Sequence, residues 1–282
     1  MNNRINKTSL LLILIAFGPA RTVSAGKAVY VGQKTSGHLS FDQIDHTAWD
    51  VLLKKYVDSD GYVDYTRWNS SRTDRRSLAG YLATLSSANP SNQAGKDSRL
   101  AFWINAYNAV TVEGILREYP TSSIRNHTAK IVGYNIWKDL QLLVAGRPYS
   151  LDAMEHEILR KEGDPRIHFA IVCASIGCPR LLNQAYTPTA LQQQLDVNAR
   201  DFFSRPQNFR YDQSARTVQL SSILQWFGED FGASQPAQLR TIARWVPKNA
   251  QSAVQSGRLR VSFADYNWDL NDQKRRGAVA GR

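Results

Sequence analysis

Residues 100–110 read Leu-Ala-Phe-Trp-Ile-Asn-Ala-Tyr-Asn-Ala-Val, and almost every side chain in this run is apolar. A helix that is apolar on all sides is stable only where other elements surround it. We therefore expect a helix over residues 98–118 that lies at the centre of the folded domain.

Two amide side chains, Asn105 and Asn108, interrupt this apolar run. Because they are three residues apart, they lie on one face of the predicted helix. A buried amide that lacks hydrogen-bond partners costs roughly 1–3 kcal/mol. Two interpretations remain open: the amides bind the backbone of a neighbouring loop, or they line a polar pocket.

Apolar residues recur at helical spacing in several other stretches, and shorter runs have the composition of strands. Helices are expected over residues 41–56, 78–85, 151–160 (with Ser150 as N-cap), 188–203 and 221–231. Extended segments are expected at 62–65, 166–173, 209–211, 217–220 and 259–263. The Asp-Ser-Asp-Gly sequence at 58–61 lacks the remaining ligands of a calcium loop, so a turn is expected there.

These elements predict an α/β or α+β fold, with a single helix-rich domain around a small central β-sheet. With 43% hydrophobic residues and seven Trp, the chain can bury a large core, which argues against disorder. We place the domain at residues 41–272, preceded by a flexible segment at 26–40 and followed by a basic disordered tail at 273–282.

The N-terminus has the pattern of a cleavable signal peptide. Arg4 and Lys7 precede the apolar run 10–17, and residues 23–25 (Val-Ser-Ala) match the small-residue cleavage site. Gly18-Pro19 ends the run well short of the roughly 20 residues that span a bilayer. We expect cleavage after Ala25, a periplasmic or secreted protein, and no transmembrane segment in the mature chain.

The net charge of +11 belongs mostly to the two ends of the chain. Removal of residues 1–25 would leave +8, and the four basic residues of the tail account for half of that, so residues 26–272 carry +4. No run of Lys and Arg alternates with aromatic residues, as a nucleic-acid groove requires. We expect no nucleic-acid partner; an unknown small molecule or an envelope component is the expected partner.

The segment 166–181 is the strongest candidate for chemistry. It begins with an apolar run, Arg166 to Cys173, which predicts a strand buried on both faces. It continues into a loop that contains Gly177, Cys178 and Pro179. Because α/β folds place their ligands at the ends of central strands, we expect a site at this loop.

Both cysteines of the chain, Cys173 and Cys178, lie in this segment, and three interpretations compete. In an oxidising compartment they form a disulfide, worth roughly 2 kcal/mol for so short a loop. Alternatively, one is a nucleophile that His168 activates as a base. Metal binding is the weakest interpretation, because the sequence offers no second ligand pair. We expect no metal and no cofactor.

The geometry of a regular strand separates these candidates. His168 shares a face with residues 170 and 172, whereas Cys173 lies on the opposite face, and Cys178 in the loop can turn either way. Cys178 is therefore the preferred nucleophile over Cys173, with Ser175 as a lesser candidate. Asn105 or Asn108 would orient the catalytic groups.

Two further segments carry candidate binding residues. Glu155 and Arg160 lie close enough along the helix 151–160 to share a site, although Glu155 alone would also favour the helix dipole. Tyr266 and Trp268 combine aromatic area with hydrogen-bonding groups, which suits the wall of a ligand site and equally the edge of a domain.

Several phrases together resemble the domain of unknown function 547 family. They are Phe102-Trp-Ile-Asn-Ala-Tyr-Asn108, Ser150-Leu-Asp with Glu155-His156 and Leu159-Arg160, His168-Phe-Ala-Ile-Val-Cys-Ala-Ser-Ile-Gly-Cys-Pro179, and Tyr266-Asn-Trp-Asp-Leu-Asn271. The resemblance covers roughly residues 41–272 in family order. It implies a domain boundary and a set of motif positions, but no reaction.

Two functions follow from these observations. The first is an exported enzyme, thiol-dependent and acting in hydrolysis or acyl transfer, with Cys178 as nucleophile and His168 as base. The second is a non-catalytic periplasmic binding or envelope module that a Cys173–Cys178 disulfide stabilises. The first function requires a free thiol at Cys178, whereas the second requires both sulfur atoms in a disulfide.

Overall fold

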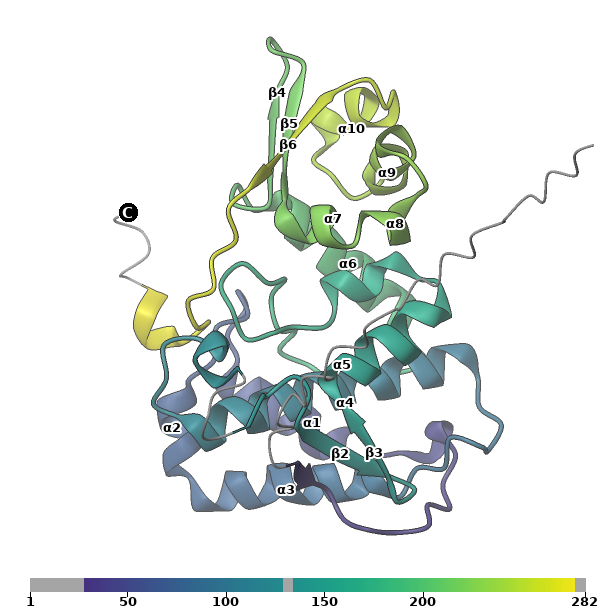
Figure 1. Ribbon diagram of the computed structural model, residues 1–282, viewed down its shortest axis with the longest axis vertical. Helices are drawn as coiled ribbons and strands as arrows, with labels where there is room; N and C mark the ends of the chain where they lie inside the picture. The colour runs from purple at the N-terminus through teal and green to yellow at the C-terminus, as the bar shows by residue number, and fades with distance from the viewer. Residues whose placement is uncertain (1–27, 129–133, 277–282) are drawn as a thin grey trace, which may run out of the picture.

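The computed structural model describes residues 28–128 and 134–276, and the expected signal peptide lies outside these residues (Figure 1). The described part is an α+β fold. Its α-helices are α1 (Thr47–Tyr56), α2 (Tyr65–Ser70), α3 (Arg72–Ser86), α4 (Lys96–Glu118), α5 (Leu151–Ala153), α6 (Leu191–Ser204), α7 (Ser222–Trp226), α8 (Gly228–Phe231), α9 (Gln235–Ile242) and α10 (Lys248–Gln255). Its strands are β1 (Val29–Val31), β2 (Leu140–Val144), β3 (Arg147–Ser150), β4 (Phe209–Asp212), β5 (Thr217–Ser221) and β6 (Arg260–Ala264).

The strands form two small sheets rather than one central sheet. In the first, β2 pairs in parallel with β1 and antiparallel with β3. In the second, β5 pairs antiparallel with β4 and in parallel with β6. Figure 1 shows the first sheet with α3 at the bottom, and the second sheet with α9 and α10 at the top.

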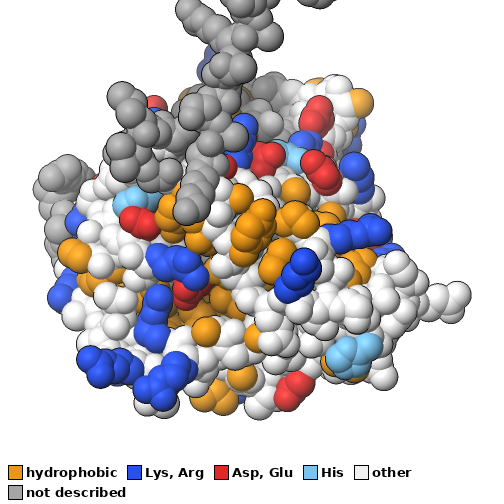
Figure 2. Space-filling model, turned by 60° about the horizontal axis from the view of Figure 1, so that its bottom comes forward, with side chains coloured by type: hydrophobic (Ala, Val, Ile, Leu, Met, Phe, Trp, Pro, Cys, Tyr) orange, Lys and Arg blue, Asp and Glu red, His pale blue; other side chains and the backbone are white. Residues whose placement is uncertain are grey.

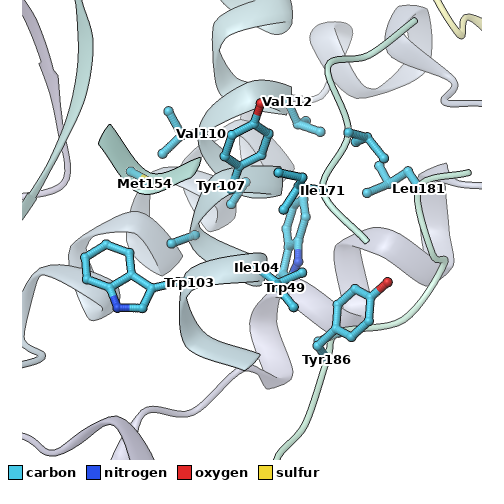
Figure 3. Packing of buried hydrophobic residues seen from close by; sticks show 14 of the residues in the cluster. Trp49, Trp103, Ile104, Tyr107, Val110, Val112, Met154, Ile171, Leu181 and Tyr186 are labelled. Carbon is cyan, nitrogen blue, oxygen red and sulfur yellow. The ribbon is translucent and has the colours of Figure 1, made fainter. Parts of the chain in front are cut away.

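Helix α4 is the centre of the larger core, as the sequence predicts. From Leu100 to Leu116 its side chains are buried on every side. Figure 3 shows Trp103, Ile104 and Tyr107 projecting from this helix into a cluster that residues of other elements complete. The helix ends at Glu118, just before Tyr119 and Pro120, where the proline disfavours helical backbone.

A second, smaller core lies under the second sheet, between α6 and helices α7 to α10. Phe169 belongs to this smaller core, whereas the next residue, Ala170, belongs to the core around α4. The segment that carries the candidate chemistry therefore crosses between the two cores.

The expected strand at 166–173 is wrong. Asp164 caps a 3-10 helix, Pro165–Phe169, by accepting the N–H of Arg166, and no regular structure follows as far as Cys173. A continuous apolar run indicates burial but cannot distinguish a strand from another buried segment. The argument that His168 and Cys173 lie on opposite faces of a strand therefore does not apply.

Amide side chains form the hydrogen bonds to the backbone of this buried segment that neighbouring strands would form in a sheet. Asn108 donates from Nδ2 to the carbonyl of Ala170 (3.0 Å) and accepts the N–H of Val172 (3.0 Å). Asn198 of α6 donates to the carbonyl of Phe169 (3.0 Å). Buried backbone groups need such partners, so two amides allow an irregular segment to run through the core.

The structure also differs from the sequence prediction at the ends of the domain. Within the segment 26–40, expected to be flexible, Val29–Val31 forms β1. Within the basic tail, Gln273–Arg275 forms a 3-10 helix, and Arg276 forms an ion pair with Asp58 (2.9 Å). These contacts add ordered residues on both sides of the predicted domain 41–272.

Other predictions need smaller changes. Residues 41–56 divide into a 3-10 helix, Phe41–Gln43, and α1, and residues 62–65 lead into the unpredicted helix α2. Helices α9 and α10 were not predicted either. The hairpin of β4 and β5, the strand β6 and the N-cap at Ser150, which accepts the N–H of Ala153, are confirmed.

No helix in the described ranges is long and apolar enough to cross a membrane. The face shown in Figure 2 has hydrophobic side chains at its middle, with Lys and Arg nearby. Most large hydrophobic side chains are nevertheless buried; Tyr30, Val51, Val197 and Trp226 are exposed.

Candidate functional site

The loop at 174–178 is held by the segment 266–271 far along the chain. The N–H of Gly177 donates to the carbonyl of Asn267 (2.8 Å), within a short antiparallel contact between the two segments. A Cβ at position 177 would lie 2.9 Å from the ring of Tyr266 and 3.0 Å from the backbone of Asn267. Only glycine allows this close approach, which brings Tyr266 to the cysteines.

The two sulfur atoms lie side by side as free thiols, with 2.7 Å between them. Cys178 Sγ also accepts the backbone N–H of Cys173 (3.0 Å) and the hydroxyl of Tyr266 (3.0 Å). The hydroxyl of Ser175 lies 3.4 Å from the same sulfur and 2.9 Å from the hydroxyl of Tyr266. Hydrogen-bond donors therefore converge on Cys178.

This arrangement favours a thiolate at Cys178. Burial opposes its ionisation, but hydrogen bonds from Cys173, Ser175 and Tyr266 outweigh burial and lower the pKa of Cys178 to about 6. The hydrogen bond to Cys178, together with burial, raises the pKa of Cys173. The pair therefore holds one proton at neutral pH, on Cys173, and the negative charge is on Cys178.

The thiols open into a cavity of about 170 Å³ between the two cores. Aromatic and aliphatic side chains make most of its wall. Its lining residues are Tyr107, Trp137, Glu155, His168, Ile171, Cys173, Cys178, Pro179, Ile223, Trp226, Phe227, Tyr266 and Trp268.

Glu155 is the carboxyl group of this cavity. It lies in a π-helical turn, Met154–Leu159, that continues α5, and such turns often occur at functional sites. The hydroxyl of Tyr107 donates to its Oε2 (3.2 Å). Burial raises the pKa of Glu155, and the charge of Cys178 adds to this effect.

His168 reaches the cavity from the 3-10 helix Pro165–Phe169, and Asp230 and Phe227 hold its ring in place. Its Nε2 lies 2.7 Å from Oδ2 of Asp230, and its ring stacks on Phe227 at 4.3 Å between centroids. Arg160 contacts both carboxylate oxygens of Asp230, at 2.7 and 2.8 Å. Burial lowers the pKa of His168, although Asp230 opposes this, so the imidazole is neutral at pH 7.

The structure brings six of the sequence-predicted residues to one cavity and places three elsewhere. The six are Cys173, Cys178, His168, Glu155, Tyr266 and Trp268. Arg160 acts on the cavity through Asp230. Asn105 binds the backbone of Tyr186, by donating to its carbonyl (2.8 Å) and accepting its N–H (3.0 Å), and Asn108 binds residues 170 and 172.

Among the described residues, no hydrogen bond joins His168 to either cysteine. His168 and Cys178 share only the wall of the cavity. No group of three or more His, Cys, Asp and Glu side chains in the described ranges could hold a metal ion.

Sequence reasoning did not find the partner of His168 or most of the aromatic wall. Asp230 lies 62 residues beyond His168, in a four-residue helix without a strong pattern. Trp226 is the last residue of the short helix α7 and Phe227 is its C-cap, and their sequence context is equally consistent with core packing. Tyr107 stands between Asn105 and Asn108, and this position in the central helix was its only signal.

A family model described as "Protein of unknown function, DUF547" matches residues 91–203. This match confirms the family resemblance for the segment from α4 to α6, which contains both cysteines. No curated protein and no solved structure matches the chain.

Proposed function

Residues 91–203 belong to the DUF547 family, and we propose that this protein is a thiol-dependent enzyme of hydrolysis or acyl transfer in which Cys178 is the nucleophile. One observation carries the proposal: the donors around Cys178 stabilise a thiolate at the wall of an apolar cavity. A thiolate is the reactive form of cysteine, and an enzyme gains from a low pKa at that group.

In the proposed reaction, the Cys178 thiolate attacks the carbonyl carbon of an ester, thioester or amide. A carbon–sulfur bond forms, the bond to the leaving group breaks, and the leaving group takes a proton. Glu155, whose pKa burial raises, is the proposed proton donor, and Tyr107 orients its carboxyl group. Water or an acceptor alcohol or amine then attacks the acyl-enzyme, and the proton of the attacking group passes to a base. The carbon–sulfur bond breaks, the acyl product leaves, and the Cys178 thiolate is restored.

His168 is the proposed base for that second step. Because Asp230 engages Nε2, only Nδ1 is available to a substrate or a water molecule. Asp230 stabilises the imidazolium that forms, and Arg160 holds Asp230 in place. Asp230 and Arg160 are therefore positioning residues, whereas Cys178, His168 and Glu155 are the proposed catalytic residues.

The nucleophile is tested with p-nitrophenyl acetate as the acyl donor. We expect the native protein to form an acyl adduct on Cys178, located by mass spectrometry, faster than N-acetylcysteine reacts at the same thiolate concentration. Cys178→Ser should lower the rate by at least about 10³-fold. Cys173→Ser, the matched variant, should retain the adduct on Cys178, and an adduct on Cys173 alone, or none, would contradict the proposal.

A second candidate is the non-catalytic binding or envelope module with a Cys173–Cys178 disulfide. The distance of 2.7 Å between the sulfur atoms favours it, because they need less than about 1 Å of movement to reach the bonded distance. Thiol titration of the native, non-reduced protein separates the two candidates. Absence of a free thiol excludes the nucleophile, and two alkylatable thiols exclude the disulfide.

We also propose that the protein is exported to the periplasm or secreted, with residues 1–25 as its signal peptide. The support is the sequence pattern of Arg4, Lys7, the apolar run 10–17 and Ala25. Cell fractionation and N-terminal sequencing of the mature protein test this; a chain that begins at Met1 and stays in the cytoplasm would contradict it.

A further inference from the structure

The cavity beside Cys178 has the size of one small apolar group. Its volume is about 170 Å³. An engineered apolar cavity of roughly 150 Å³ in another protein stays dry and binds benzene. The space within the cavity therefore fits a phenyl ring or a short alkyl chain.

The charges of the residues around the cavity disfavour a ligand with an ionised group. Among the described residues that line the cavity, none is Lys or Arg. Burial favours the neutral form of Glu155 and the neutral form of His168. Arg125 and Arg160 lie over the rings of Trp268 and Phe227 in the wall, at 5.2 and 5.4 Å, but Arg160 is already paired with Asp230 and Glu229. An anionic group would meet the Cys178 thiolate, and desolvation of its charge would be costly.

An aromatic wall faces the space beside the thiols. The ring of Trp226 lies 4.9 Å from Tyr266 and 5.8 Å from Trp268, centroid to centroid. Trp226 is 47% exposed, although Trp is usually well buried. An apolar occupant would cover part of this exposed ring, and aromatic contacts of this kind stabilise a complex beyond the burial of area.

We infer that this cavity binds an uncharged, apolar acyl group of about the size of a phenyl ring, which the cavity places against Cys178. This inference rests on the proposed function, since it assigns the acyl side of the substrate of the same site. The apolar wall excludes water from the thiolate and positions the carbonyl carbon for attack.

Binding is tested on the full native chain, which keeps the Cys178 thiolate, with two ligands that carry no activated leaving group. Benzamide and benzoate are matched in size and differ in charge. By isothermal titration calorimetry, we expect benzamide to bind and benzoate to bind at least tenfold more weakly. Trp226→Ala should weaken benzamide binding by about fivefold or more, whereas Tyr30→Ala, at another exposed aromatic residue, should leave it unchanged.

Equal binding of benzamide and benzoate, or benzamide binding that Trp226→Ala does not weaken, would overturn the inference. Neither binding result requires a reaction at Cys178. If benzamide binds as expected but native protein forms no acyl-enzyme, the proposed function fails and the apolar site stands. If an acyl-enzyme forms equally well from p-nitrophenyl acetate and p-nitrophenyl phenylacetate, the nucleophile stands and the acyl specificity fails.

Discussion

The hydroxyl of Tyr266 lies 3.0 Å from the sulfur of Cys178, although 88 residues separate them in the chain. The contact depends on Gly177, whose lack of a side chain lets the two segments approach. Tyr266 is therefore part of the environment that ionises Cys178, in addition to forming a wall of the cavity.

Alkylation of Cys178 should follow its lowered pKa. We expect the rate with iodoacetamide to rise with a midpoint near pH 6 and to level off above it, because the thiolate is the reactive form. An ordinary thiol has its midpoint at about 8.5. The measurement is mass spectrometry of the Cys178 peptide after timed labelling between about pH 4.5 and 9.

Tyr266→Phe should raise that midpoint by roughly one pH unit, because the thiolate loses one hydrogen bond. Tyr211→Phe, in strand β4 and away from the cavity, is the control and should leave the midpoint unchanged. A native midpoint near 8.5 would show that the surrounding donors do not ionise Cys178.

Gly177→Ala should damage the site through a steric clash. The new methyl group must displace the ring of Tyr266 or the backbone of Asn267. We expect a loss of about 1–3 kcal/mol in the free energy of unfolding and a higher pKa for Cys178. Urea unfolding and the alkylation profile measure the two effects.

Gly80→Ala is the matched control, because nothing lies within 4 Å of a Cβ at that position in α3. Alanine is the better helix former, so this variant should gain about 0.5–1 kcal/mol and keep the midpoint of the native protein. If Gly177→Ala keeps both native stability and the native midpoint, the close approach is not needed.

The sequence predicts best where a pattern is local. Helix α4 follows from an apolar run that needs burial on every side, and the hairpin of β4 and β5 follows from alternation around a turn. The path of residues 166–173 does not follow, because Asn108 and Asn198 supply from other helices the hydrogen bonds that a strand would need.

The residues of the candidate site also differ in whether the local sequence or only the tertiary structure brings them together. Cys173, Cys178 and His168 are found together because they lie in one segment of the chain. Asp230 and Trp226 join them only through the packing of α7 and α8 against this segment, and their local sequence carries no sign of that contact. The role of Tyr266 in the electrostatics requires the position of its hydroxyl, which only the structure gives.

Substitution of the two buried amides of α4, Asn105 and Asn108, should lower the stability of the protein in both cases but change the cavity in only one. Asn108→Ala and Asn105→Ala each leave one buried carbonyl and one buried N–H without a side-chain partner. We expect each to lose about 2–5 kcal/mol in the free energy of unfolding. Thermal or urea unfolding measures this loss.

Only Asn108→Ala should also change the cavity. Its hydrogen bonds hold residues 170 and 172, and Ile171 between them lines the cavity, whereas Asn105 holds Tyr186, outside the cavity wall. Asn108→Ala should therefore weaken benzamide binding under conditions where both variants are folded. Equal binding by the two variants would contradict this assignment.

His46 should make the stability of the protein fall in mild acid. Burial lowers its pKa from 6.5 to about 4, and its Nδ1 lies 2.6 Å from the hydroxyl of Tyr81. Because the unfolded chain binds a proton at His46 before the folded chain does, its contribution is complete above pH 6.5 and is lost as the pH falls through 4. The linked loss is at most about 3 kcal/mol.

Urea unfolding of native protein and His46→Gln at pH 7 and pH 4 measures this contribution. Glutamine keeps a hydrogen-bonding group near Tyr81 but does not titrate, so the variant should lose less stability between the two pH values than native protein does. His38→Gln, at an exposed histidine, is the control and should match native protein. If His46→Gln loses as much stability as native protein, His46 is protonated in the folded state at pH 4 without cost, and its burial does not govern the acid sensitivity.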